Sequence, residues 1–220
     1  MNHFLHFRKI LNGSYKIERQ RILEQITFFR RYNCLFIHIP KTGGISASEA
    51  LFKKDSFGHF FISEYYKIAP RTEFNNMFKF SIVRNPYTRI YSAYMYLKNE
   101  GRNTGLDRAY SKIINQYQSF DEFVATWLSK RKNQDQMLHF VPQYKFVSYK
   151  DKLLVDFIGR SESLSEDVKI IANRLNIDSY VLERKNSSSN GGIEVEMKSE
   201  TRIIIQDIYQ KDFEMFNYLT

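Results

Sequence analysis

The chain has 220 residues, of which 43% are hydrophobic and 16% aromatic, enough for one sizeable core and too many for a disordered protein. Lys and Arg outnumber Asp and Glu by 33 to 24, a formal net charge of +9, which favours a polyanionic partner: nucleic acid, an acidic membrane surface or a small polyanion. The single cysteine, Cys34, excludes an internal disulfide and a cysteine-cluster zinc site. We find no signal peptide and no transmembrane run in the sequence, and therefore expect a cytoplasmic protein.

The N-terminal segment carries much of the excess charge. Residues 1–33 hold seven basic and two acidic residues, and Ile22, Leu23, Ile26 and Phe29 fall on one face of a helix. We predict a basic helical arm over 1–33 and a single domain over 34–220. The arm has two open roles: packing on the domain edge with its charges in water, or contact with an anionic membrane or acidic glycan. Without an RNP-like motif, zinc-finger spacing or an Arg-rich tract, we expect no specific nucleic-acid partner.

Alternating strands and helices follow. The apolar run 34–39 ends at Pro40 and is typical of a buried parallel strand. A tight turn over 41–44 and a helix over 45–52 come next, and 78–83 predicts a second buried strand.

The rest of the chain continues this pattern. A helix follows the turn at 84–86, with Tyr87, Ile90, Tyr91, Tyr94 and Leu97 at helical spacing. A strand is predicted over 153–158. The segment 163–166 then has the form of a capping box before a helix over 164–175. One more helical face runs from 205 to 216. Together these elements predict an α/β domain with a mainly parallel central sheet flanked by helices.

The first turn has the composition of an anion site. It offers Lys41, the Thr42 hydroxyl, two glycines and Ser46 at a predicted strand end and helix start. Glycines let backbone N–H groups approach an anion, and the helix start adds about half a positive charge. The turn is not a Walker A loop, because its lysine precedes the glycines, and this disfavours an ATPase or kinase.

The second turn places Arg84 at a strand end, with Arg89 and Ser92 on the following helix. Arg84 and Ser92 can form a second phosphate site if the turn folds the arginine back toward the helix. The alternative is that Arg84 and Arg89 pair with surface carboxylates and that Ser92 is only a packing residue.

As a pair, the two turns resemble a known family. IHIPKTGG at 37–44 and VRNPYTRIYSAY at 83–94 look like the signatures of carbohydrate sulfotransferases, in particular the branch of heparan sulfate 2-O-sulfotransferases and bacterial relatives. Weaker similarities at 139–143, 155–162 and 209–218 extend the resemblance over about 34–218. The resemblance implies a P-loop-like three-layer fold. It also implies sulfonate transfer from 3′-phosphoadenosine 5′-phosphosulfate (PAPS) to a carbohydrate hydroxyl, releasing PAP without a metal.

The resemblance also assigns roles to residues of the nucleotide site. The loop made of Lys41, Thr42, Gly43, Gly44, Ile45 and Ser46 would hold the 5′-phosphosulfate, with Lys41 hydrogen-bonded to the bridging oxygen. Arg84 and Ser92 match the positions that hold the 3′-phosphate. Lys185 and Asn186, in the loop-like stretch 185–192, would contact the adenine.

The catalytic base follows from a further match. GHFFISE at 58–64 resembles the family segment with the catalytic histidine, so His59 is the predicted general base, with Glu49 or Glu64 as a partner that orients it. His139 is the alternative base, and His139 and Gln143 are predicted acceptor contacts. His38 is expected to pack beneath the site.

Two other functions stay open: a P-loop-type ATP-dependent kinase, and a non-catalytic basic module that binds polyanions. On the sulfotransferase interpretation, the acceptor is a polysaccharide, capsule, lipopolysaccharide or glycolipid. The protein would then be bacterial and cytoplasmic, with a peripheral membrane contact through 1–33 as one option.

Overall fold

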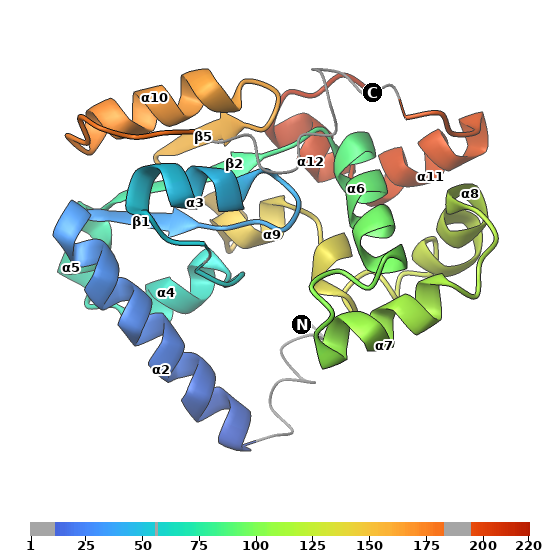
Figure 1. Cartoon of the computed structure of the whole chain (residues 1–220), viewed down its shortest axis with the longest axis horizontal. Coiled ribbons are helices and arrows are strands. Elements are labelled where there is room, and N and C mark those ends of the chain that lie inside the picture. The colour runs from blue at the N-terminus through green and yellow to red at the C-terminus, as the bar shows by residue number, and fades with distance from the viewer. Residues whose placement is uncertain (1–11, 56, 183–194) are drawn as a thin grey trace. The chain divides into compact units, whose positions relative to one another are not determined.

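The computed structural model describes residues 12–55, 57–182 and 195–220, and side chains from residue 15 onward. It divides into two compact units (Figure 1). Among the described residues, unit 1 comprises those within 12–83 and 143–182, and unit 2 comprises those within 84–142 and 195–220.

A parallel sheet forms the centre of unit 1. It contains β1 (Cys34–Ile37), β2 (Phe78–Val83) and β5 (Phe157–Arg160) in the order β1-β2-β5. All four residues of β1 and five of the six in β2 are buried, as expected for strands covered on both faces. Ser81, opposite Ile37 in the register, donates its hydroxyl hydrogen to the Ile37 carbonyl at 2.7 Å. The short strands β3 (Ser148–Tyr149) and β4 (Lys152–Leu153) form a separate antiparallel pair.

Helices cover both faces of this sheet. Helix α3 contacts α10, and Figure 1 shows them on one side of the sheet with α4 on the other. The predicted α/β architecture, a mainly parallel sheet flanked by helices, is confirmed. The helices of unit 1 are α2 (Asn12–Phe29), the 3-10 turn η1 (Arg30–Tyr32), α3 (Gly44–Phe52), α4 (Ile62–Ile68), α5 (Arg71–Asn76), α9 (Tyr144–Val147) and α10 (Leu164–Arg174).

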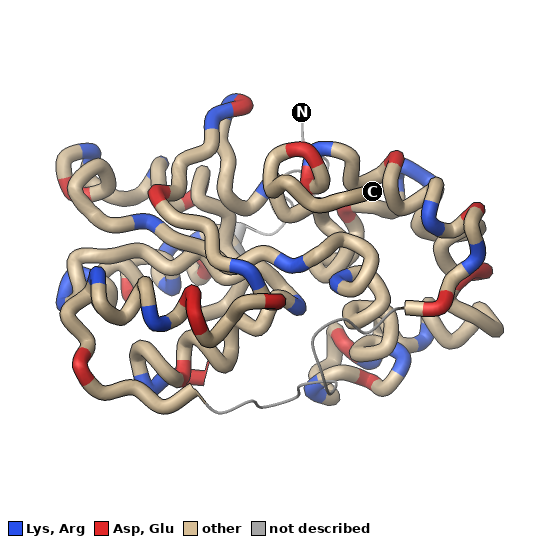
Figure 2. Tube along the Cα trace, turned by 90° about the horizontal axis from the view of Figure 1, so that it is seen from above, with Lys and Arg blue, Asp and Glu red and all other residues tan. Residues whose placement is uncertain are grey.

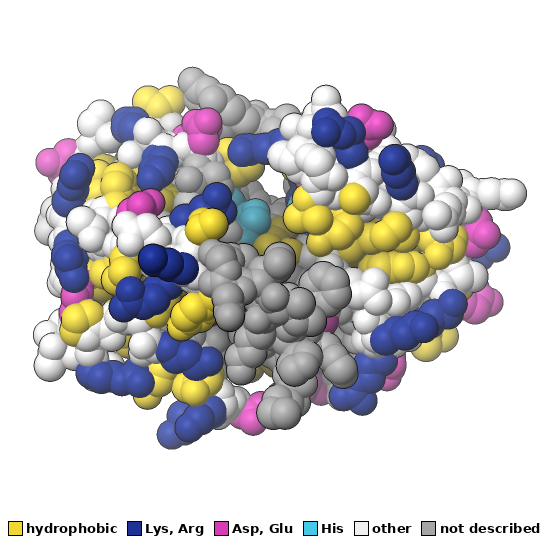
Figure 3. Space-filling model, turned by 90° about the horizontal axis from the view of Figure 1, so that it is seen from below, with side chains coloured by type: hydrophobic (Ala, Val, Ile, Leu, Met, Phe, Trp, Pro, Cys, Tyr) yellow, Lys and Arg dark blue, Asp and Glu magenta, His cyan; other side chains and the backbone are white. Residues whose placement is uncertain are grey.

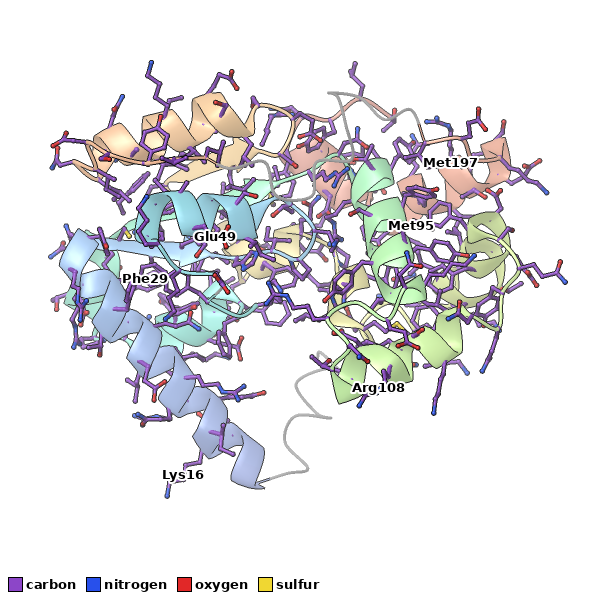
Figure 4. All side chains as sticks on the ribbon, viewed as in Figure 1. Lys16, Phe29, Glu49, Met95, Arg108 and Met197 are labelled. Carbon is purple, nitrogen blue, oxygen red and sulfur yellow. The ribbon has the colours of Figure 1, made fainter. Side chains whose placement is uncertain are left out.

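Helix α2 packs on unit 1 through its second half. Ile22, Ile26 and Phe29 are buried, and α2 contacts β1 and α4. Phe29, labelled in Figure 4, lies against the rings of Phe52 and Phe57, with ring centroids 5.5 and 4.5 Å apart. The predicted apolar face therefore joins the core of unit 1. The division into an arm over 1–33 and a domain over 34–220 stays a prediction.

The first half of α2 is basic and exposed. Lys16, Arg19 and Arg21 are all exposed, and Figure 4 shows Lys16 pointing away from the protein. In Figure 3, many Lys and Arg side chains lie over unit 1, at the left of that view. Contact with an anionic glycan or membrane remains a prediction for this half. Across the described ranges, none of the helices is long and apolar enough to cross a membrane.

Unit 2 is helical. Its elements are α6 (Pro86–Lys98), α7 (Gly105–Ile114), α8 (Phe120–Phe123), the π-helical turn η2 (Val124–Leu128), the 3-10 turn η3 (Leu138–Phe140), α11 (Ser199–Ile208) and α12 (Gln210–Met215). One apolar cluster holds them together, and among its members are Tyr94, Phe123, Trp127, Phe140 and Tyr209. In both units, acidic and basic residues are scattered along the trace (Figure 2).

The predicted strand over 153–158 is wrong in its position. Leu153 ends β4, and pairing with β2 begins at Phe80 opposite Phe157 and continues to Arg160. Asp156 stands just before this pairing, where its Oδ2 accepts from the Lys79 N–H at 2.7 Å and lies 3.0 Å from Lys79 Nζ. A long-range contact, rather than the local apolar run, therefore sets the start of β5.

The predicted capping box at 163–166 is also wrong. Ser163 is the N-cap of α10 but its side chain caps no backbone N–H; it donates to Asp167 Oδ2 at 2.7 Å. The same Asp167 oxygen accepts from the Arg160 N–H at 2.8 Å, so Asp167 rather than Glu166 anchors this end of the helix.

The C-terminal helical face is interrupted. It consists of α11 and α12, which meet at Tyr209. Tyr209 is buried, and its hydroxyl donates to the Phe140 carbonyl at 2.6 Å.

Candidate active site

The loop after β1 has an unusual backbone. Lys41 has φ +68° and Gly43 has φ +83°, both in the left-handed region. A residue with a Cβ in that region costs about 1–2 kcal/mol, so the surrounding structure must hold Lys41 in place. Thr42 supplies part of this support, because it is fully buried and its hydroxyl donates to the Ile39 carbonyl at 3.0 Å. The Thr42 side chain thus braces the loop from inside.

The two glycines of the loop are required for different reasons. Gly43 needs its positive φ, and a Cβ there would also lie 3.1 Å from Leu164 of α10. Gly44 is required because a Cβ at this position would lie 2.2 Å from the His38 ring. From the sequence, we expected the glycines to let backbone N–H groups approach an anion. In the structure they also allow the loop to pack closely on Leu164 and His38.

The start of α3 is suited to an anion. Its N-cap is Gly43, which has no side chain to cap the helix, and its first turn has no acidic residue. The first helical hydrogen bond runs from the Ala47 N–H to the Gly43 carbonyl at 3.2 Å. The amides of Gly44, Ile45 and Ser46 therefore come before the intrahelical ladder, at the positive end of the helix dipole. This geometry fits a phosphate-like group.

His59 lies beside this loop in unit 1. Its Nδ1 is 2.9 Å from the His38 carbonyl oxygen, and the two imidazole centroids are 4.3 Å apart. Because a carbonyl can only accept, Nδ1 carries the proton, and the neutral ring has its lone pair on Nε2. Nε2 is thus the nitrogen that can act as a base.

A backbone carbonyl, that of His38, makes the contact at Nδ1 of His59. Glu64, one of the two predicted partners, caps α4: its Oε2 accepts from the Phe61 N–H at 2.8 Å. Glu49, the other, lies on α3, as labelled in Figure 4. The carbonyl of His38 was not predicted, because no local pattern links residues 21 positions apart.

The second turn folds Arg84 back onto α6, as the prediction required. Arg84 Nε donates to Thr88 Oγ1 at 3.0 Å, one turn into the helix. Ser92 follows Thr88 by four residues, so all three lie along one helical face, and Ser92 is half-buried. Asn85 caps the helix by accepting from the Tyr87 N–H at 3.0 Å, with Pro86 in its first turn. The Arg84 side chain therefore folds onto α6 at Thr88, one helical turn before Ser92, and a joint phosphate site of Arg84 and Ser92 stays a prediction.

Arg89 has a structural role that the sequence interpretation missed. It is fully buried and donates to the carbonyls of His139 at 3.1 Å and Val141 at 2.8 Å. Burial lowers the pKa of Arg89, while Tyr209 and Asp212 oppose that shift. Helical spacing could have predicted this burial, since residues 86, 89, 90, 93 and 97 fall on the core face of α6.

Replacing Arg89 by methionine is expected to lower the free energy of unfolding by about 2–4 kcal/mol, because two buried carbonyls lose a charged donor. Arg108 on α7, labelled in Figure 4, is the matched control: it is exposed and bonds the carbonyl and side chain of Asn103. Arg108→Met should cost about 0.5 kcal/mol or less. Urea unfolding measures both, and equal losses would refute the structural role of Arg89.

The remaining predicted residues lie in different surroundings. His139 is half-buried in η3 of unit 2, with its ring centroid 5.3 Å from that of Tyr96. Gln143, in unit 1, is fully buried at the start of α9. Lys185 and Asn186 lie outside the described residues.

A cavity of about 430 Å³ in unit 1 contains none of the predicted residues. Its lining includes Asn33, Phe78 and Asp156, which precede or begin β1, β2 and β5. It therefore opens at the amino ends of the strands, whereas the Lys41 loop follows a carboxyl end, where ligands of parallel sheets bind.

Comparisons with known proteins give the family. The chain is 28% identical over 118 residues to an uncharacterized protein of Archaeoglobus fulgidus, covering 53% of this chain and 82% of that relative. No solved structure matches. A model of the sulfotransferase family matches residues 24–219, which include both turns and His59. This match favours a transferase of sulfate groups over an ATP-dependent kinase or a non-catalytic module. The chain belongs to the sulfotransferase family.

Proposed function

We propose that the protein transfers the sulfonate group of PAPS, in line, to a hydroxyl of a carbohydrate. The observation that carries this proposal is the loop after β1, in which Lys41 with a positive φ is followed by the glycine N-cap of α3. Family membership supports sulfonate transfer in general, and the resemblance of the two turns to carbohydrate sulfotransferases supports the donor and the acceptor class.

The donor would be held at its two anionic ends. Lys41 and the amides of Gly44, Ile45 and Ser46 would bind the 5′-phosphosulfate. Arg84 and Ser92 would bind the 3′-phosphate, for which the planar fork of arginine suits a bidentate contact. Lys185 and Asn186 are the proposed adenine contacts.

Lys41 and His59 would carry the chemical step. Lys41 donates a hydrogen bond to the bridging oxygen and offsets the charge that develops on the phosphate as its bond to sulfur breaks. His59 Nε2 accepts the proton of the attacking hydroxyl while the new sulfur–oxygen bond forms. The products are a sulfate ester and PAP. Because Lys41 and the helix start supply the positive charge, the proposed step needs no metal ion.

The acceptor would be a sugar hydroxyl of a polysaccharide, capsule, lipopolysaccharide or glycolipid. His139 and Gln143 are the proposed contacts, and only His139 has an accessible side chain. A peripheral contact of the basic arm 1–33 with an acidic glycan or membrane belongs to the same proposal, as does action in a bacterial cytoplasm.

The acceptor class can be tested with ³⁵S-labelled PAPS. The protein is incubated with neutral and acidic polysaccharides, lipopolysaccharide, glycolipids and small phenols, and label in each acceptor is counted. We expect the wild-type protein to label a carbohydrate and the Lys41→Ala variant to leave the same carbohydrate unlabelled. Label confined to phenols would contradict the carbohydrate acceptor and leave sulfonate transfer intact.

A further inference from the structure

The side chain of His38 lies between the anion loop and the proposed base, all within unit 1. His38 follows the end of β1 and is 4% exposed. Its ring stacks on that of Phe36, with centroids 5.5 Å apart and planes 16° apart. This stacking on Phe36 of β1 therefore holds the His38 ring in place.

One edge of the His38 ring supports the start of α3. A Cβ built on Gly44 would lie 2.2 Å from His38 Cδ2 and 2.4 Å from Nε2. Real Cβ atoms do not approach ring atoms so closely, so Gly44 rests directly on the imidazole. The first amide of α3, which the proposed function assigns to the donor, thus has its position set by this ring.

The same residue holds His59. The His38 carbonyl accepts from His59 Nδ1 at 2.9 Å, and the two rings are 4.3 Å apart at an interplanar angle of 56°. Backbone and side chain of His38 therefore both contact the proposed base.

We propose that His38 is a positioning residue that fixes the anion loop and the base His59 relative to one another. This inference rests on the proposed function. A smaller side chain would leave a gap beneath Gly44 and beside His59, and a larger ring would displace α3. Since a misplacement of about 1 Å can cost about a hundredfold in rate, the contact should matter to turnover.

The test combines substitutions at the two ends of the contact. Gly44→Ala should weaken PAP binding about tenfold or more, because the new methyl group must displace either the ring or the helix start. Gly105 is the matched control: it also begins a helix, α7, and a Cβ there meets nothing within 4 Å. Gly105→Ala should leave PAP affinity and kcat unchanged.

Removing the ring should relieve the clash. In His38→Ala/Gly44→Ala, PAP affinity should recover most of what Gly44→Ala loses, because the methyl group then occupies the vacated space. Turnover should not recover, since His59 has lost the neighbouring ring. His38→Ala alone should lower kcat about tenfold or more and weaken PAP binding less than Gly44→Ala does, because Thr42 still braces the loop, and His38→Gln, which keeps the reach of the ring, should restore much of kcat.

The outcomes separate the two claims. Thermal unfolding first establishes that each variant is folded. If His38→Ala is not folded, His38→Gln and the double variant His38→Gln/Gly44→Ala take the place of His38→Ala and His38→Ala/Gly44→Ala. If the wild type binds PAP but the effects on PAP affinity simply add in the double variant, or if His38→Ala keeps full kcat, the positioning role is wrong. If the wild type binds no PAP, the proposed function itself fails.

Discussion

Lys41→Ala is expected to lower kcat for sulfonate transfer by about 10²- to 10³-fold, the usual effect of removing one positioned donor to developing negative charge. The structure gives this lysine a left-handed backbone directly before the start of α3. Such a conformation is retained only where the surrounding structure imposes it. Because Lys41 would act most strongly as the bridging bond breaks, kcat should fall more than donor affinity.

Lys53 offers a matched control for this substitution. It stands at the other end of α3, is exposed, and also has a positive φ, of 53°. Lysine and alanine both carry a Cβ, so backbone strain changes little at either position. Lys53→Ala should keep wild-type kcat in a ³⁵S-PAPS assay. Equal kcat values for the two variants would show that Lys41 is not the catalytic cation.

His59→Ala is expected to lower kcat by about 10²- to 10⁴-fold, the usual contribution of a general base. The contact of His59 Nδ1 with the His38 carbonyl places the proton of the neutral ring on Nδ1, so Nε2 is the basic nitrogen. PAP affinity should stay near the wild-type value, because the proposed nucleotide contacts do not include His59. Calorimetric titration with PAP and steady-state kinetics measure the two effects separately.

His139→Ala provides the comparison for the base assignment. If His139 contacts the acceptor, its loss should raise the KM for the acceptor more than it lowers kcat. The reverse pattern, in which His139→Ala is inactive and His59→Ala is active, would transfer the role of base to His139.

The elements around the two turns were predictable from the sequence. β1 is buried on both faces and is a continuous apolar run, whereas β2 is mostly apolar with Lys79 and Ser81 between its apolar residues; the turns after both strands contain glycine or proline. The proposed phosphate site required Arg84 to fold back toward α6, and its hydrogen bond to the Thr88 hydroxyl holds it there. Local chemistry sufficed in these places.

The parts that were mispredicted or missed depend on long-range contacts. The start of β5 depends on Asp156 and Lys79, which lie 77 residues apart in the chain. The break at Tyr209 accompanies a hydrogen bond to the carbonyl of Phe140, and Arg89 is buried on carbonyls about 50 residues away. The sequence predicted that His38 packs beneath the site, but its close contact with Gly44 depends on how the loop folds over the ring and was not predicted.

Thermal unfolding with PAP in the presence of EDTA, compared with ATP and Mg²⁺, tests whether PAPS is the donor. A ligand that binds only the folded state stabilises it by RT ln(1 + L/Kd), where L is the free ligand concentration, and the melting temperature rises accordingly. The account predicts stabilisation by PAP without metal, reduced in Arg84→Ala, which lacks the proposed 3′-phosphate contact. Stabilisation by ATP with Mg²⁺ alone, and none by PAP, would contradict it.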